Sequence, residues 1–166
     1  MSTGASTSPL ATTIGEEYAR YIQHLADRVE RAARALPKEK LWNKPFAFGN
    51  SVGHLILHLT GNMNHYVGAL IAGTGYIRDR PREFTEPAPP PAEEAMAKFR
   101  GAVAMVIHTV RAQDDAGLMT AVTDQPPVQT RFGLLLVVTA HLNNHIGQMA
   151  YLVQAQGHST QEPPIW

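Results

Sequence analysis

Hydrophobic residues recur at every third or fourth position in four stretches of the chain, the spacing that places them on one face of an α-helix. Pro37 ends the first stretch because proline cannot continue a helix, and Gly73 ends the second. Asn50 or Ser51 can cap the second helix at its start. The predicted helices cover residues 14–36, about 51–72, about 92–113 and about 131–156.

The segment between the second and third predicted helices is long and rich in proline. It contains a charged part, residues 76–84, followed by the proline-rich stretch 87–91. Such a stretch favours a stiff, non-helical conformation that can carry the chain from one end of a bundle to the other. Residues 118–130 are expected to form an extended loop or a short turn. The pattern therefore predicts an all-α fold, a four-helix bundle with a long proline-rich crossover between helices two and three.

The length of 166 residues is that of one ordinary domain, so we expect residues 1–166 to form a single bundle. Residues 1–12 are predicted to be a flexible polar lead, without the pattern of a signal peptide, and residues 158–166 a C-terminal tail. The longest apolar run, 132–140, is far shorter than the roughly 20 residues that a membrane span needs. We therefore expect a cytoplasmic protein with no membrane partner.

Charge and cysteine content narrow the chemistry further. The chain has 14 basic and 14 acidic residues, so it lacks the basic excess of a nucleic-acid-binding protein, and we expect no nucleic-acid partner. It contains no cysteine, so thiolate metal sites and cysteine nucleophiles are excluded. Any metal ion must be bound through nitrogen and oxygen.

Two histidine pairs stand at helical spacing in the second and fourth predicted helices. The pairs, His54 with His58 and His141 with His145, lie in stretches 50–77 and 132–161, which contain no Asp, Glu, Lys or Arg. Helices without charge are expected to be buried, and a buried imidazole needs a hydrogen-bond partner or a metal ion. An isolated core histidine is more often satisfied by a backbone carbonyl, so it is the pairing that favours a metal site between the two helices.

One ion cannot bind every histidine on these faces. His65 falls on the same side of the second helix as His54 and His58, yet His54 and His65 are about 16 Å apart along the axis. The fourth-helix pair plus one second-helix histidine gives three nitrogen ligands and an open position, which is typical of catalytic rather than structural sites. Spacing alone does not choose between His54 and His58.

Neither histidine-bearing helix contains a carboxylate. The Glu-x-x-His pairs of di-iron bundles and the His-Glu-x-x-His of zinc proteases are therefore absent, and the pattern indicates a mononuclear site. Proton transfer is expected to fall to a metal-activated water, to a free histidine such as His54 or His65, or to a carboxylate from elsewhere such as Glu83. The charged residues of the crossover are most simply part of a solvated loop, although an arginine there could bind an anionic substrate; they are Arg78, Arg80, Arg82 and Glu83. The polar residues expected to orient ligands or substrate are Asn62, Asn144 and Gln148.

Three segments resemble the DinB-like superfamily, which includes the YfiT-like metal-dependent hydrolases: His58-Leu-Thr-Gly-Asn62, the crossover from Tyr76 to Phe84, and the segment from Ala140 to Gln148. The resemblance implies a four-helix bundle of antiparallel type, commonly a homodimer, with nickel or zinc bound by three histidines. Carried over by position, these ligands are His58, His141 and His145. Related proteins include thiol-dependent transferases that use bacillithiol or mycothiol, and a maleylpyruvate isomerase.

Two classes of function stay open at this point. The first is a metal-dependent enzyme in which one divalent ion activates water for hydrolysis, or a low-molecular-weight thiol for S-transfer, to a small-molecule substrate. The alternative is a non-catalytic helical module that binds a metal ion or a small ligand. A homodimer is also expected, because two charge-free helices offer more apolar surface than one cleft buries.

Overall fold

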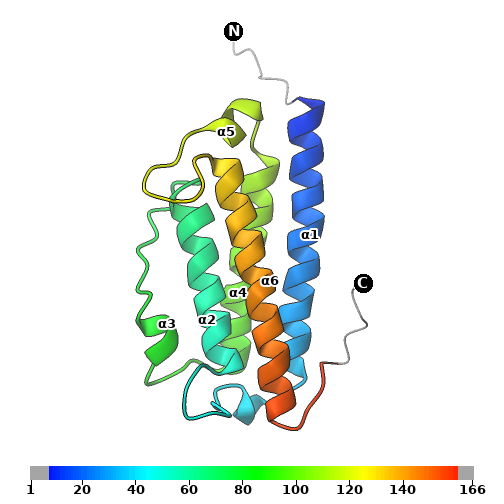
Figure 1. Cartoon of the computed structure of the whole chain (residues 1–166), viewed down its shortest axis with the longest axis vertical. Helices are drawn as coiled ribbons and strands as arrows, with labels where there is room; N and C mark the ends of the chain where they lie inside the picture. The colour runs from blue at the N-terminus through cyan, green and yellow to red at the C-terminus, as the bar shows by residue number, and fades with distance from the viewer. Residues whose placement is uncertain (1–7, 161–166) are drawn as a thin grey trace.

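The computed structural model describes residues 8–160. Four long helices lie side by side along the molecule, as Figure 1 shows: α1 (Pro9–Arg34), α2 (Val52–Met63), α4 (Ala92–Arg111) and α6 (Arg131–Ala155). This arrangement confirms the predicted all-α four-helix bundle. Apart from one isolated bridge between Ala121 and Thr130, residues 8–160 contain no β-structure.

The long crossover determines the direction of the helices. After α2 the chain runs back along the outside of the bundle, so α4 starts at the same end as α2 and runs in the same direction (Figure 1). The bundle is therefore the type with one long crossover, and α2 and α4 are parallel rather than antiparallel. α2 and α6, which carry the two histidine pairs, are antiparallel neighbours.

The first helix begins earlier than predicted. Ser8 caps it by accepting a hydrogen bond from the backbone N–H of Ala11, and Pro9 occupies the first turn, where its missing N–H costs nothing. Residues 9–12 are therefore helical, although the polar sequence predicted a flexible lead. The rest of that lead, residues 1–7, and most of the predicted tail, residues 161–166, lie outside the described residues.

The second predicted helix changes its winding part-way along. It is α-helical to Met63 and continues as a π-helix, η2 (Asn64–Ala69), in which the N–H of Leu70 donates to the carbonyl of His65. Hydrophobic periodicity in the sequence does not distinguish the α-helical part from the π-helical part, because a single π turn inserts only one extra residue. Such turns are frequent at functional sites.

Two short helices occupy segments that were predicted to be non-helical. One is α3 (Arg82–Thr85) within the charged part of the crossover, where the backbone N–H of Arg82 donates to Asp79 Oδ1. The other is α5 (Asp115–Met119), which Asp114 caps by accepting from the N–H of Gly117. A helix of one turn has too few residues for a periodic pattern, so its sequence is typical of a loop.

All four long helices contribute to a single hydrophobic core. Each helix contributes a side chain that is at most 1% exposed: Ile22 from α1, Leu55 from α2, Phe99 from α4 and Leu142 from α6. Nearly all of α2 is buried, as its lack of charge predicted. In the described part of the chain no helix has the length and apolarity that crossing a membrane requires.

Candidate metal centre

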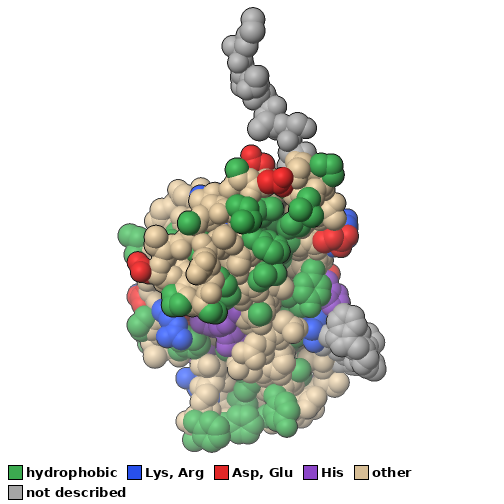
Figure 2. Space-filling view, turned by 45° about the horizontal axis from the view of Figure 1, so that its top comes forward, with side chains coloured by type: hydrophobic (Ala, Val, Ile, Leu, Met, Phe, Trp, Pro, Cys, Tyr) green, Lys and Arg blue, Asp and Glu red, His purple; other side chains and the backbone are tan. Residues whose placement is uncertain are grey.

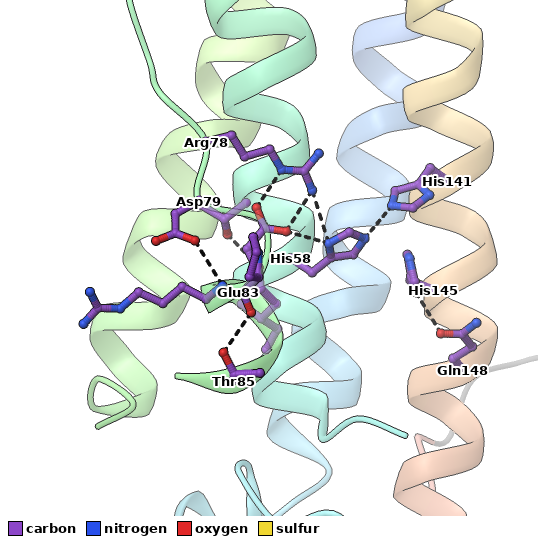
Figure 3. Close-up of polar contacts among 12 residues, drawn as sticks. His58, Arg78, Asp79, Glu83, Thr85, His141, His145 and Gln148 are labelled. Atoms are coloured by element: carbon purple, nitrogen blue, oxygen red, sulfur yellow. Dashed lines mark hydrogen bonds and ion pairs between the residues drawn. The ribbon is translucent and has the colours of Figure 1, made fainter. Parts of the chain in front are cut away.

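Three of the predicted site histidines lie together between α2 and α6. His58 projects from α2, and His141 and His145 project from successive turns of α6 (Figure 3). Each offers one ring nitrogen, and these three nitrogens lie within 4.8 Å of one another. Because residues four apart on a helix share one face, α6 presents two imidazoles and the facing helix supplies the third.

His58 is oriented by a carboxylate from the crossover. Its Nδ1 lies 2.7 Å from Oε2 of Glu83, and a carboxylate only accepts, so Nδ1 carries the proton. The Nε2 of His58 keeps its lone pair and lies 2.8 Å from Nε2 of His141. This tautomer is the one that a metal ligand requires when its other nitrogen is held by a carboxylate.

Glu83 is itself held in place by an arginine. Nε of Arg78 donates to Oε1 of Glu83 at 2.7 Å, and Nη2 donates to Oε2 at 2.8 Å. The Glu83 side chain is 7% exposed and that of Arg78 is 10% exposed, so this is a buried bidentate ion pair. The two residues were expected in a solvated loop, and the structure corrects this, because α3 folds back against α2.

A glycine in α2 makes room for the carboxylate. If Gly61 carried a Cβ, that atom would lie 2.0 Å from Oε1 of Glu83. Gly61 follows His58 by three residues and so lies on the same side of α2 one turn later. The helix therefore combines a histidine with a gap through which Glu83 reaches its Nδ1.

The charge on Glu83 is stabilised despite its burial. Burial alone raises the pKa of this carboxyl, but the hydrogen bonds from Arg78 and His58 outweigh it and the pKa is lowered below its ordinary value. Both oxygens are occupied by these partners. The structure thus indicates that Glu83 positions His58, whereas the sequence had suggested Glu83 as a candidate for proton transfer.

His145 is oriented from its own helix. Its Nδ1 lies 2.8 Å from Oε1 of Gln148, which accepts the Nδ1 proton and leaves Nε2 free to face the other two rings. Gln148 was among the residues predicted to orient a ligand, and it contacts a site histidine. Of the other two, Asn62 is buried in α2, while Asn144 lies exposed on α6.

The environment keeps the fourth-helix imidazoles neutral. Burial, followed by the nearby imidazoles His145 and His58 and by two arginines, lowers the pKa of His141 to about 4. Burial also lowers the pKa of His145, and His58 lowers it further, against an opposing hydrogen bond from Gln148. A neutral imidazole is the form that binds a metal ion, so both side chains are ready for coordination near neutral pH.

The donor set fits a divalent transition metal. Three imidazole nitrogens bound at about 2.0–2.1 Å around a tetrahedral ion would be separated by roughly 3.3 Å, which small side-chain movements reach from the observed spacing. Imidazole ligands suit zinc, nickel, copper and iron rather than magnesium or calcium. The three histidines could therefore hold one such ion and leave at least one position open.

The other two histidine candidates lie elsewhere. Nδ1 of His54 is 2.7 Å from Oγ of Ser51, the cap of α2, and its ring packs edge-on against Trp42. His54 is therefore not among the three convergent imidazoles. His65 lies in η2 with its ring against Tyr66, and its pKa is lowered by burial and by the charge of Arg78, against an opposing effect of Glu83.

The comparison with known families agrees with this geometry. The sequence profile of the DinB superfamily matches residues 13–149, which include the whole histidine cluster and the crossover. The chain belongs to the DinB superfamily. A search of curated proteins gives no match.

Sequence reasoning missed two residues on which the site depends. Arg78 looked like one charge among several in a loop, and Gly61 like an ordinary helix glycine. The only sequence signal for the latter was its place in the DinB-like segment His58-Leu-Thr-Gly-Asn62. The close approach of Glu83 to that glycine is visible only in three dimensions.

Proposed function

We propose that this DinB superfamily protein is a metal-dependent enzyme in which His58, His141 and His145 bind one divalent ion, nickel or zinc. The observation that carries the proposal is the convergence of three imidazole nitrogens within 4.8 Å, with the opposite nitrogen of His58 held by Glu83 and that of His145 by Gln148. Ring orientation by such partners is typical of metal ligands.

The chemistry of the proposed enzyme is either hydrolysis or transfer of a low-molecular-weight thiol to a small-molecule substrate. When bound, the ion supplies Lewis acidity, which lowers the pKa of a coordinated water or thiol. The chain orients the ligands through Glu83 and Gln148 and surrounds the site with the apolar core, where electrostatic interactions are stronger than in water. His141 is half-buried, so small molecules can reach this edge of the cluster.

We also propose that the protein is a homodimer. α2 is covered within one subunit, but exposed apolar side chains remain on α6, where Leu136 is 52% exposed and Val137 is 37% exposed, and on the adjacent α1, where Leu10 is 66% exposed. Figure 2 shows a group of hydrophobic side chains on one face with few charged groups among them. A second copy would cover such a surface. The cytoplasmic location stays a prediction.

Metal content and turnover together test the proposed function. The purified protein is expected to contain about one nickel or zinc ion per chain, and the loaded protein to consume a low-molecular-weight thiol or a simple ester faster than the stripped protein. His54→Ala is the control, because His54 is a buried histidine of the same helix that lies outside the cluster. Metal binding without any turnover would instead support the non-catalytic module.

A further inference from the structure

A groove continues the seam between α2 and α6 beyond the histidine cluster. It has a volume of about 620 Å³ and is lined by Leu55 of α2, by residues of α6 that include Gln148 and Tyr151, and by Asn50 of the preceding loop. Leu55 precedes His58 by one turn, and Gln148 follows His145 by one turn, so the faces that carry the histidines also form the groove. The volume is that of an ordinary small-molecule site.

Gln148 connects the groove to the cluster. Its Oε1 lies 2.8 Å from Nδ1 of His145, while the same side chain forms part of the groove wall. Its amide nitrogen has no hydrogen-bond partner among the described residues and can donate to a bound molecule. A group held at this end of the groove therefore lies beside the proposed metal ligands.

The groove contains no charged side chain. The ring of Tyr151, which is 73% exposed, offers apolar surface, and the amides of Asn50, Asn144 and Gln148 offer hydrogen bonds. A charged ligand would lose its hydration here without gaining an ion pair. An uncharged molecule with an apolar part and a carbonyl or amide group is the better match.

We propose that this groove binds the body of an uncharged substrate, with an apolar group against the ring of Tyr151 and a carbonyl group on the amide of Gln148. The inference rests on the proposed metal-dependent function, because it treats the histidine cluster as the place of reaction. Binding energy from this non-reacting part would then place the reacting group at the cluster.

Gly147 provides a way to fill the groove without disturbing the fold. It lines the groove, and a Cβ added there meets nothing within 4 Å. Gly101 of α4 offers the matched control, since a Cβ added there also meets nothing within 4 Å and it lies outside the groove lining. Leucine favours a helix over glycine at both positions, so Gly147→Leu and Gly101→Leu should both fold.

The test uses N-benzylacetamide as the neutral probe and 3-phenylpropanoate as an anionic probe of similar shape, each followed by ligand-observed NMR. Gly147→Leu should raise the dissociation constant of N-benzylacetamide at least tenfold, and Gly101→Leu should leave it unchanged. In cobalt-loaded protein the bound probe should show faster proton relaxation than in zinc-loaded protein, because the groove adjoins the cluster. The anionic probe should show no dependence on Gly147.

The outcomes separate this inference from the proposed function. Metal content, measured on each variant, reports the histidine site, whereas probe binding can be measured even on protein without metal. Equal affinity of wild type and Gly147→Leu for N-benzylacetamide would overturn the groove as a binding site. A substitution at Gly147 that weakens binding of 3-phenylpropanoate alone would overturn it as well. Relaxation that is equal in the cobalt and zinc forms would remove the link to the cluster. Light scattering that shows Gly147→Leu separating a dimer would assign the groove to the second copy instead.

Discussion

The Glu83 carboxylate lies 2.7 Å from Nδ1 of His58, although the two residues are 25 positions apart and belong to different elements. The contact exists because the crossover folds over α2 and because Gly61 leaves space for the carboxylate. It fixes the tautomer of the one second-helix histidine in the cluster.

Removing the Glu83 charge should weaken metal binding without removing any ligand. Glu83→Gln leaves His58 without its anionic partner and Arg78 without its buried counter-ion, so we expect metal affinity to fall about 10- to 100-fold. Gly61→Ala should have a similar effect by displacing the carboxylate. Chelator competition measures both, with Gly101→Ala as the control.

Circular dichroism of the same proteins shows whether the bundle survives these changes. Folded Glu83→Gln and Gly61→Ala proteins that retain wild-type affinity would show that the carboxylate does not position a ligand.

Single alanine substitutions should identify the ligands. We expect His58→Ala, His141→Ala and His145→Ala each to lose bound metal during dialysis against a mild chelator, because two imidazoles hold an ion less tightly than three. His54→Ala should retain the metal ion, since His54 lies outside the cluster and its Nδ1 is hydrogen-bonded to Oγ of Ser51. Retention of metal in His58→Ala with loss in His54→Ala would contradict the assignment. Full retention in both His141→Ala and His145→Ala would exclude the site.

The parts of this protein that could be predicted from sequence are those that depend on periodicity. The four long helices follow from apolar spacing, and the pair His141 and His145 follows from a separation of four residues on one of them. The choice of His58 over His54 did not follow from spacing, since both stand on α2. It came from the motif around His58, and the structure supplies the reason in Gly61.

The rest could not be predicted because it depends on contacts between distant segments. A charged stretch such as 76–84 is ordinarily solvated, and nothing in its pattern shows that Arg78 and Glu83 neutralise each other within the fold. The π-helical winding of η2 could not be predicted either, because one additional residue in a turn barely changes a hydrophobic pattern. Sequence therefore predicted which histidines could meet, and Gln148 as a residue that orients a ligand, but not the pairing of Glu83 with Arg78 that holds His58.

A charge on the apolar face of α6 should separate the proposed dimer. Leu136→Glu places a carboxylate where the side chain is 52% exposed in one subunit, and burying that charge against a second copy would be costly. Light scattering at micromolar concentration should then give the mass of one chain, against two for wild type. Ile77→Glu is the control, because Ile77 is 91% exposed and belongs to the crossover rather than to α6. A wild-type protein that already has the mass of one chain would refute the dimer.

The stability of the metal-free protein should fall as the solution becomes more acidic, through a window set by His141. Its pKa is about 4 in the folded chain, lowered first by burial and then by neighbouring positive groups, whereas an unfolded histidine titrates near 6.5. Between these values the unfolded chain binds more protons than the folded one, so the free energy of unfolding rises with pH. The contribution is fully present above about 6.5 and is lost as pH falls towards about 4.

Urea unfolding midpoints measured across this range, with metal removed, should therefore decrease towards low pH, and the decrease should be smaller in His141→Gln than in wild type. An equal pH dependence in the two proteins would show that His141 is not held neutral by the fold.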